Sequence, residues 1–245
     1  MTQDLYADAE LYDLLHDDYR DDLAFYRGLA EDFGGPVLEL GAGSGRVTVA
    51  LARAGFEVVA VEPAAAMRAR GAARLDASGV GGRVAWLDAD ARRLELERDF
   101  PLVIAPFHML MHLADLDDQD AALRAARAHV AVGGAFATDV YVPRFGPSGV
   151  VRSEPTWAGL QGDLSTWQLV DPIGQTVVTE HRLDRTLPDG TVRRRAATLR
   201  QRYFHRFELE RALRAAGFGR VRTFGGFDRG PVTAAASSWA YLAQP

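Results

Sequence analysis

Val37-Leu38-Glu39-Leu40-Gly41-Ala42-Gly43-Ser44-Gly45-Arg46 is the stretch that decides the fold of this 245-residue chain. Its first residues are typical of a short strand, its three glycines stand at alternate positions, and a helical pattern begins at Arg46. Glycine lets the backbone turn sharply and approach a ligand with no Cβ in the way. The helix that follows offers unpaired N–H groups and the positive end of its dipole to an anionic group. The stretch therefore predicts a strand, a tight turn and a helix that together hold a ligand.

Two better-known glycine loops do not fit this spacing. The dinucleotide fingerprint G-x-G-x-x-G would need a third glycine where Arg46 stands. A phosphate-binding loop would continue with Gly-Lys-Ser or Gly-Lys-Thr, which is absent here. A strand–helix turn without a ligand remains as an alternative, although three glycines cost conformational entropy that such a turn does not require.

A rhythm of strand and helix continues outward from the loop. Upstream, leucines and tyrosines near helical spacing predict one or two helices within 9–32, and Gly34-Gly35-Pro36 ends that pattern. Strands that alternate with helices imply a parallel sheet covered on both faces, which is an α/β fold. The predicted strands are 37–40, 57–61, 83–87, 102–105 and 135–142; the predicted helices are 46–54, 63–77 with Pro63 in its first turn, and 117–130 ended by Gly133-Gly134.

The pattern changes after residue 143. Runs typical of strands at 167–170, 176–186 and 191–203 are separated by turn signals at 171–174 and 187–190, which predicts an antiparallel meander. A helix over 207–216 and strands at 220–224 and 239–242 follow. We therefore expect one domain over 1–245, with a helical N-terminal segment at 1–35 and a β insertion at 144–204.

Two carboxylates follow the second and third predicted strands. Glu62 is placed to accept hydrogen bonds from both hydroxyls of a ribose, and glutamate is a poor helix N-cap, the other role open to it. Asp90 could accept the amino proton of an adenine while the Ala91 N–H donates to the ring, or it could simply cap a helix. Because the carboxyl ends of parallel strands share one edge of the sheet, the loop and both acids should lie together.

In this order, the motifs resemble those of class I S-adenosylmethionine-dependent methyltransferases, from Val37 to about Val142. The resemblance implies a doubly wound, seven-stranded, mostly parallel sheet whose last strand is antiparallel, with S-adenosylmethionine as the cofactor. It places the methionine end of the cofactor over Gly41–Gly45 and the sulfonium near Pro106–His108. The cofactor-binding residues implied are Glu39, Gly41, Ala42, Gly43, Gly45, Arg46, Glu62, Pro63, Met67, Asp90, Ala91, Pro106 and Phe107.

The segment after the fourth predicted strand, 106–113, carries the candidates for chemistry. If the methyl acceptor is an amine or a hydroxyl, a nearby group must carry away its proton, and histidine titrates near neutral pH. His108 and His112 are spaced to share a helix face, yet a zinc site would need further ligands. Local packing is the favoured interpretation for His108, and for His112 packing and chemistry are about equally supported.

Residues 107–113 also resemble small-molecule N-methyltransferases of the amino-deoxysugar N,N-dimethyltransferase type. In that group an N-terminal helix with tyrosines closes over the cofactor and a β-meander follows the fifth strand. The resemblance implies that His112 faces the acceptor amine, that Tyr12 and Tyr19 cover the donor, and that Arg20 pairs with the methionine carboxylate. Packing of an amphipathic helix is an equally good explanation of the two tyrosines. The arginines at 193–195, 200 and 202 form either a solvated outer face or a contact for an anionic acceptor.

The amino-acid composition limits the kinds of site and binding partner that the chain can have. All 28 basic residues are arginine, cysteine is absent and the net charge is −5, so thiolate metal sites and disulfides are excluded and a nucleic-acid surface is disfavoured. No basic and apolar leader and no long apolar run are present, which predicts a cytoplasmic protein without a membrane span. The exclusive use of arginine indicates a GC-rich genome, and the layout resembles that of many bacterial methyltransferases, which implies a bacterial protein. We expect a small-molecule acceptor, with O-methylation or a non-catalytic cofactor-binding module as alternatives, and a homodimer through the insertion.

Overall fold

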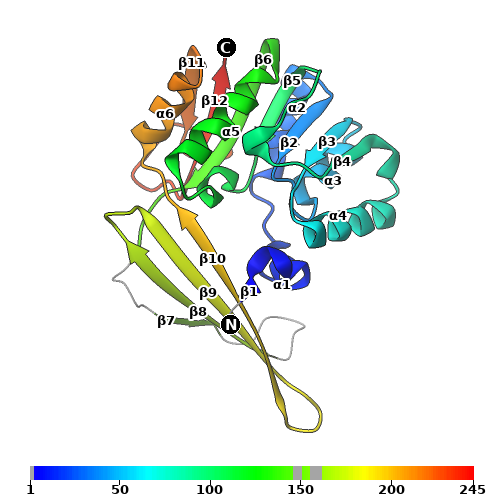
Figure 1. Cartoon of the computed structure of the whole chain (residues 1–245), viewed down its shortest axis with the longest axis vertical. Coiled ribbons are helices and arrows are strands. Elements are labelled where there is room, and N and C mark those ends of the chain that lie inside the picture. Colours follow the sequence, from blue (N-terminus) through cyan, green and yellow to red (C-terminus); the bar gives the residue numbers. More distant parts are fainter. Residues whose placement is uncertain (1–2, 146–150, 155–161) are drawn as a thin grey trace.

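The computed structural model describes residues 3–145, 151–154 and 162–245. Two sheets make up its framework: a seven-stranded sheet in the upper part of Figure 1 and a five-stranded sheet in the lower part. Within these ranges no helix is long and apolar enough to cross a bilayer.

The seven-stranded sheet has the strand order β11-β12-β6-β5-β2-β3-β4. Its strands β2 to β6 run parallel, whereas β12 runs antiparallel to both of its neighbours. The predicted α/β fold class is therefore confirmed, including the antiparallel last strand. The strands are β2 (Val37–Leu40), β3 (Val58–Val61), β4 (Val84–Leu87), β5 (Phe100–Ala105), β6 (Val130–Tyr141), β11 (Arg220–Phe224) and β12 (Ser238–Gln244).

Helices cover both faces of this sheet because side chains alternate along each strand. Val37 and Leu102 pack in a cluster with the helices α2 (Leu23–Phe33) and α3 (Arg46–Arg53). Leu38 and Val103 point the other way and pack with α5 (Leu116–Ala128) and α6 (Arg206–Ala215). Every residue of β2 is buried, which explains why three of its four residues are apolar and why apolar and polar residues do not alternate along it. α4 (Ala65–Ser78) follows β3.

The five-stranded sheet has the order β1-β10-β9-β8-β7. Its long strands β8 (Asp163–Asp171), β9 (Thr176–Thr186) and β10 (Val192–Arg202) form the predicted antiparallel meander, with turns where the sequence placed them. Two short strands were not predicted: β7 (Val151–Glu154) pairs with β8, and β1 (Gln3–Asp4) adds to β10 in parallel.

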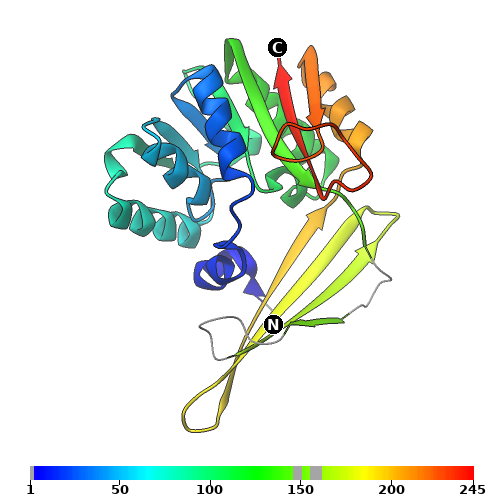
Figure 2. The same ribbon diagram turned by 180° about the vertical axis from the view of Figure 1, so that it is seen from behind.

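The N-terminal segment lies between the two sheets, as both ribbon views show (Figures 1 and 2). It consists of β1, the 3-10 helix η1 (Leu5–Ala7) and α1 (Ala9–His16), and the predicted helical stretch 9–32 indeed forms two helices. Leu5 and Leu11 pack against Leu183 and Ala197 of the five-stranded sheet. Asp13 of α1 binds arginines of α4, so the segment contacts both halves of the molecule.

Three local predictions were wrong. Pro63 lies outside α4, which begins two residues later with Ala64 as its N-cap. Gly133-Gly134 does not end a helix: α5 stops at Ala128 with His129 as its C-cap, and both glycines lie within β6. There is no room for a Cβ at Gly134, where it would lie 2.7 Å from the Pro101 carbonyl oxygen.

His108 and His112 share no helix face, because His108 is in a left-handed turn before the 3-10 helix η4 (Met109–His112). The remaining 3-10 helices are η2 (Gly81–Arg83) and η3 (Ala91–Arg93).

Candidate functional site

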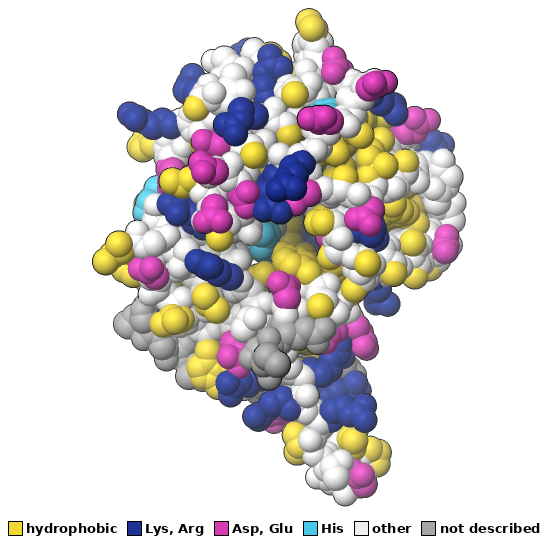
Figure 3. Space-filling model, in the orientation of Figure 1, with side chains coloured by type: hydrophobic (Ala, Val, Ile, Leu, Met, Phe, Trp, Pro, Cys, Tyr) yellow, Lys and Arg dark blue, Asp and Glu magenta, His cyan; other side chains and the backbone are white. Residues whose placement is uncertain are grey.

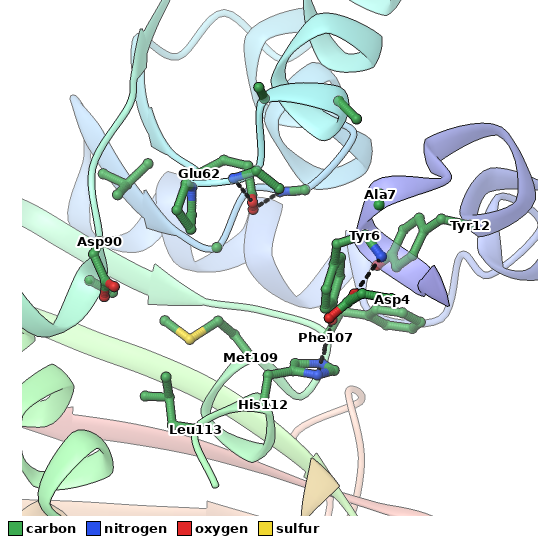
Figure 4. Close-up of a pocket in the computed structure, with 18 of the residues that line it drawn as sticks. Asp4, Tyr6, Ala7, Tyr12, Glu62, Asp90, Phe107, Met109, His112 and Leu113 are labelled. Atoms are coloured by element: carbon green, nitrogen blue, oxygen red, sulfur yellow. Dashed lines mark hydrogen bonds between the residues drawn. The ribbon is translucent and has the colours of Figure 1, made fainter. Parts of the chain in front are cut away.

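A cavity of about 660 Å³ lies where β2, β3 and β5 end, beside the N-terminal segment (Figure 4). Its volume is within the range of about 300–1,000 Å³ that is usual for small-molecule sites. Ten of the residues predicted from the sequence line it: Tyr12, Gly41, Gly43, Glu62, Pro63, Asp90, Ala91, Pro106, Phe107 and His112. The other lining residues are Asp4, Tyr6, Ala7, Val61, Ala64, Ala65, Ala66, Arg92, Met109 and Leu113.

The glycine loop forms one wall of this cavity. Gly41, Gly43 and Gly45 have φ of +69°, +58° and +81°, a backbone conformation in which residues with a side chain are strained. Gly45 directly precedes α3. A Cβ on Gly41 would lie 2.4 Å from the Met109 side chain. The three glycines therefore have a conformational reason to be there, and the loop presents bare backbone at Gly41 and Gly43 to a ligand.

Glu62 joins the glycine loop to the start of α4. Its buried carboxylate accepts hydrogen bonds from the Gly43 N–H at 2.9 Å and from the Ala64 N–H at 2.8 Å. Burial raises the pKa of this carboxyl, and the two N–H groups act in the opposite direction. Each oxygen keeps a second lone pair, which allows the carboxylate to accept ligand hydroxyls from the cavity that it lines.

Asp90 has the capping role considered for it and also lines the cavity. Its Oδ1 accepts a hydrogen bond from the Arg92 N–H at 2.9 Å, so it caps η3, and its carboxylate also binds the Arg92 guanidinium. The Arg92 guanidinium also donates a hydrogen bond of 2.5 Å to the carboxylate of Asp118 in α5. The Arg92 side chain lowers the pKa of Asp90, which keeps a negative charge at this end of the cavity.

Seven predicted residues lie outside the lining of the cavity: Tyr19, Arg20, Glu39, Ala42, Gly45, Arg46 and Met67. Ala42, Gly45 and Met67 are buried beneath or beside the loop. Glu39 is 1% exposed and accepts a hydrogen bond from the Thr48 hydroxyl of α3 at 2.6 Å. Burial raises the pKa of Glu39 to about 8, so this side chain is a neutral acid in the core at pH 7.

Arg46 and Tyr19 connect the N-terminal segment to α3. The Arg46 guanidinium makes two hydrogen bonds of 2.6 Å to the buried Asp22 carboxylate and one of 3.1 Å to the Tyr19 carbonyl oxygen. The same guanidinium lies over the rings of Tyr19 and Phe107, at 5.3 and 4.9 Å from their centroids. These contacts position Phe107, which lines the cavity.

The turn after β5 depends on a residue that the sequence reasoning missed. Phe107 and His108 both have positive φ, +55° and +61°, which is costly for side chains of this size. The fully buried Asp139 of β6 accepts hydrogen bonds from the Phe107 N–H at 2.8 Å and the Tyr26 hydroxyl at 2.5 Å, and its Oδ2 lies 2.9 Å from His108 Nδ1. Burial by itself would raise the pKa of Asp139, but His108 and these donors lower it. A charged residue inside an apolar strand was the signal that could have identified Asp139.

His112 lies at the other end of the cavity from Asp90, where its ring contacts the N-terminal segment (Figure 4). The Tyr6 hydroxyl is 3.0 Å from the His112 ring nitrogens, and Gln201 of β10 approaches Nε2 at 3.5 Å. Burial, together with the charges of His108 and His16, lowers the pKa of His112 to about 3. His112 is therefore neutral at physiological pH. Tyr6 was missed because nothing in the sequence separates it from other tyrosines near the N-terminus.

These residues fit an adenosyl cofactor. A carboxylate stands near each predicted ribose and adenine position, apolar side chains such as Val61 and Met109 lie between them, and bare glycine backbone faces the cavity. Among the residues that the structure describes, no group of three or more His, Cys, Asp or Glu side chains could hold a metal ion.

Comparisons with known proteins agree with this geometry. Residues 37–134 match the family model of a methyltransferase domain. The CcbJ methyltransferase from Streptomyces caelestis has a TM-score of 0.86 at 24% identity, over 100% of this chain and 99% of that one. SAM-bound CalS10, an amino pentose methyltransferase from Micromonospora echinaspora involved in calicheamicin biosynthesis, has a TM-score of 0.72 at 22% identity, over 94% and 91%.

One curated protein matches over a shorter stretch. The ribosomal RNA small subunit methyltransferase A of Anaeromyxobacter dehalogenans is 47% identical over 75 residues, which are 31% of this chain and 24% of that protein. The chain thus spans about a quarter of the length of this relative. Residues 37–134 thus match a methyltransferase domain, and the chain shares the α/β fold of CcbJ and CalS10, the fold that the glycine loop and the two acids predicted.

Proposed function

We propose that this enzyme transfers a methyl group from S-adenosylmethionine to the nitrogen of a small amine. The observation that carries the proposal is the composition of the cavity near His112, where a neutral imidazole, two tyrosines and one carboxylate meet (Figure 4). Glu62 and Asp90 occupy the part of the cavity suited to the ribose and adenine. The cofactor, when bound, supplies a methyl group that its sulfonium already activates, so the chain has mainly to align the acceptor.

His112 has the properties of an orienting group rather than a strong base. With a pKa near 3 it cannot hold a proton taken from an ammonium, but its neutral ring can accept a hydrogen bond from an N–H. Tyr6 fixes the ring through its hydroxyl at 3.0 Å. Burial raises the pKa of both Tyr6 and Tyr12, so these phenols also stay neutral.

Asp4 favours a cationic acceptor over an anionic one. It lines the cavity beside Tyr6, and its Oδ1 accepts a hydrogen bond from the Tyr6 N–H at 2.8 Å. The carboxylate has capacity to pair with an arriving ammonium, whereas a carboxylate or phosphate acceptor would meet like charge.

Three of the arginines considered for an anionic acceptor have partners within the chain, and of these Arg202 donates to the Gln175 side chain at 3.2 Å. Arg194 binds Asp184 on the exposed side of the five-stranded sheet, and Arg195 binds Asp8 and Glu10 of the N-terminal segment. Arg193 and Arg200 are exposed. Arg194 and Arg200 therefore support the solvated outer face, whereas the pairing register places Arg195 on the inner face, where Asp8 and Glu10 neutralise its charge.

The inner face of the five-stranded sheet supports a small polar acceptor. The pairing register places Thr166, Gln168, Thr179, His181 and Gln201 on the face that carries Leu183 and Ala197 toward the N-terminal segment. None of these five side chains is a carboxylate or an arginine, and all can form hydrogen bonds. Figure 3 shows a hollow between the two halves of the molecule on this side, walled partly by hydrophobic side chains. That CalS10 acts on an amino pentose supports an acceptor of similar size.

Within residues 1–35 we assign the role of a lid to the N-terminal segment of β1, η1 and α1, because α2 packs in the core of the seven-stranded sheet, and we assign the insertion, residues 144–204, the role of the acceptor wall. Tyr6 and Tyr12 of the segment line the cavity, while Tyr19 packs against Phe107 with ring centroids 5.3 Å apart. Opening of the segment would expose the cofactor site, and closing it would exclude water from the reaction.

Three alternatives make different predictions. O-methylation would require that hydroxyl analogues be methylated as well as amines, and a binding module would bind cofactor without turnover on any acceptor. A ribosomal RNA substrate, which the short curated match suggests, would give salt-sensitive RNA binding. The net charge of −5 and the carboxylate of Asp4 argue against RNA.

The test is a methyl-transfer assay with labelled cofactor on paired amino and hydroxy sugars, simple amines and ribosomal RNA. We expect transfer to amines only, and a loss of at least about tenfold in kcat for His112→Ala, since one orienting hydrogen bond is worth about 1.4 kcal/mol or more in such a step. Binding of S-adenosylhomocysteine should persist in this variant. Unchanged turnover in His112→Ala, or transfer to hydroxyls or RNA instead of amines, would contradict the proposal.

A further inference from the structure

A second cavity, of about 470 Å³, lies between the α1–α2 connection, α3 and α4. It shares no lining residue with the cofactor cavity, so it belongs to a different site. Its walls are formed by five arginines, one aspartate and an apolar group of residues: Arg20, Arg46, Arg53, Arg70, Arg74, Asp17, Leu23, Val49, Ala50, Ala73 and Ala77.

The positive charge of this cavity is only partly neutralised. Asp22 pairs with Arg46, Asp13 pairs with both Arg70 and Arg74, and Asp17 pairs with Arg74 alone. Three carboxylates thus face five guanidinium groups, which leaves the charges of Arg20 and Arg53 in excess. The exposed Asp18 and Asp21 of the same connection are not among the lining residues.

Several guanidinium donors are free to bind a ligand. Arg20 makes one hydrogen bond, of 3.2 Å to the Tyr19 carbonyl oxygen, which Arg46 also contacts. Arg70 uses only its Nε, on Asp13. Across the described ranges Arg53 makes no ion pair, so its five N–H donors are available to a ligand. Guanidinium groups that converge from three elements match the geometry of a phosphate oxygen cluster.

We propose that this arginine-lined cavity binds a small phosphate-bearing anion and that the bound anion fastens the N-terminal segment to the methyltransferase domain. A phosphate held jointly by Arg20 of the α1–α2 connection and Arg53 of α3 would tie the two together. Because α1 and α2 flank that connection, an anion bound here should favour the closed position over the cofactor. Free phosphate compounds and phosphate esters with an apolar part share this chemistry, and the apolar floor around Val49 and Ala73 would favour the esters.

The first test is calorimetric titration of the full chain with pyrophosphate and with adenosine monophosphate at about 0.15 M salt, near physiological ionic strength. We expect saturable binding that weakens at least tenfold in Arg53→Gln. Arg211→Gln, a change of an exposed arginine on α6 far from the cavity in sequence, is the matched control and should bind as the unaltered chain does. Absence of binding, or equal weakening in both variants, would overturn the proposal; a tighter fit of one probe identifies the source of the phosphate.

The second test measures the affinity for S-adenosylhomocysteine with and without saturating pyrophosphate. Linkage requires that an anion which favours closure tighten cofactor binding, and we expect a gain of at least threefold that Arg53→Gln abolishes. Equal cofactor affinity in both conditions would contradict the fastening role. Neither test involves a methyl acceptor, so failure of the anion-binding proposal is distinguishable from failure of the proposed amine methylation.

Discussion

Burial changes the role of His112 from the one its residue type suggests. A histidine near pH 7 is a natural proton acceptor, yet the surroundings of His112 lower its pKa to about 3. For the proposed amine acceptor, we therefore predict that the free amine reacts and that its proton leaves by a route other than His112.

A pH profile tests this role. Since His112 is already neutral across pH 5–8, kcat/KM should rise with pH toward the pKa of the acceptor amine with no inflection from the enzyme near 6.5. The profiles of the unaltered enzyme and of His112→Gln, whose amide can still meet Tyr6, should be parallel and displaced only in height. An inflection near pH 6.5 that disappears in His112→Gln would show that the histidine is the base.

Glu39 allows a test of stability at the same scale. Its pKa is raised to about 8 in the folded chain, above the value of about 4.3 that an unfolded glutamate has. Folding therefore favours the protonated form, and the stability that this group contributes is present at low pH and lost as pH rises through 8. The glutamine of Glu39→Gln cannot ionise, so this variant does not lose that stability. The difference in free energy of unfolding between the variant and the unaltered chain should therefore increase, in favour of the variant, by about 1 kcal/mol per pH unit between pH 5 and 8. Denaturant unfolding at pH 5, 6.5 and 8 measures the gain; a difference independent of pH would refute it.

At the scale of elements, the turn between β5 and η4 is held from the neighbouring strand. Asp139→Asn removes the charge that faces the Phe107 N–H, the Tyr26 hydroxyl and His108. Hydrogen bonds to a charged group are worth about 1.5–3 kcal/mol, so we expect a loss of stability of that order. We also expect kcat to fall at least tenfold, because the turn carries Phe107 and leads to His112.

Tyr26→Phe is the matched control for this prediction. It removes one hydrogen bond to the same carboxylate, at 2.5 Å, and leaves the backbone of the turn in place. Thermal unfolding and kcat measured together separate the two effects. If both variants lose stability but keep the kcat of the unaltered enzyme, Asp139 has no positioning role in the reaction.

Elements with strong local signals could be predicted from the sequence, whereas those that depend on distant contacts could not. Three apolar residues out of four indicate the buried strand β2, and glycines at alternate positions indicate the loop after it. In contrast, β1 has two residues and exists only because β10, almost 200 positions away, offers its edge. Gly133-Gly134 resembles a helix stop, but Gly134 is needed for the close approach of β6 to Pro101.

The same distinction holds for the site. Glu62 and Asp90 follow strands at fixed places, so the sequence located them beside the cavity. Arg46 and Tyr19, which the resemblance assigns to the cofactor, contact Asp22 and Phe107 around the loop, and their role toward the cofactor stays a prediction. Tyr6 and Asp4 reach the cavity only because the N-terminal segment folds back over the sheet edge, a tertiary contact that no local pattern records.

At the scale of the whole molecule, the N-terminal segment joins two sheets that otherwise meet mainly through the connections at β6 and β10 (Figures 1 and 2). Within the ranges that the structure describes, β7 is the outermost strand of the five-stranded sheet beside β8, and the edge of such a strand can pair with a second chain. We predict a homodimer through this sheet. Light scattering should give twice the 26.7 kDa of one chain at micromolar concentration; the mass of a single chain would contradict the prediction.

We infer that an adenosyl cofactor binds where β2, β3 and β5 end, with Glu62 on its ribose. Calorimetric titration with S-adenosylhomocysteine tests it without knowledge of the acceptor. We predict one binding site per chain, an affinity at least tenfold weaker in Glu62→Gln, which corresponds to about 1.4 kcal/mol, and no change in Glu57→Gln, whose side chain is exposed five residues earlier. No binding, or equal affinity in the two variants, would contradict the account.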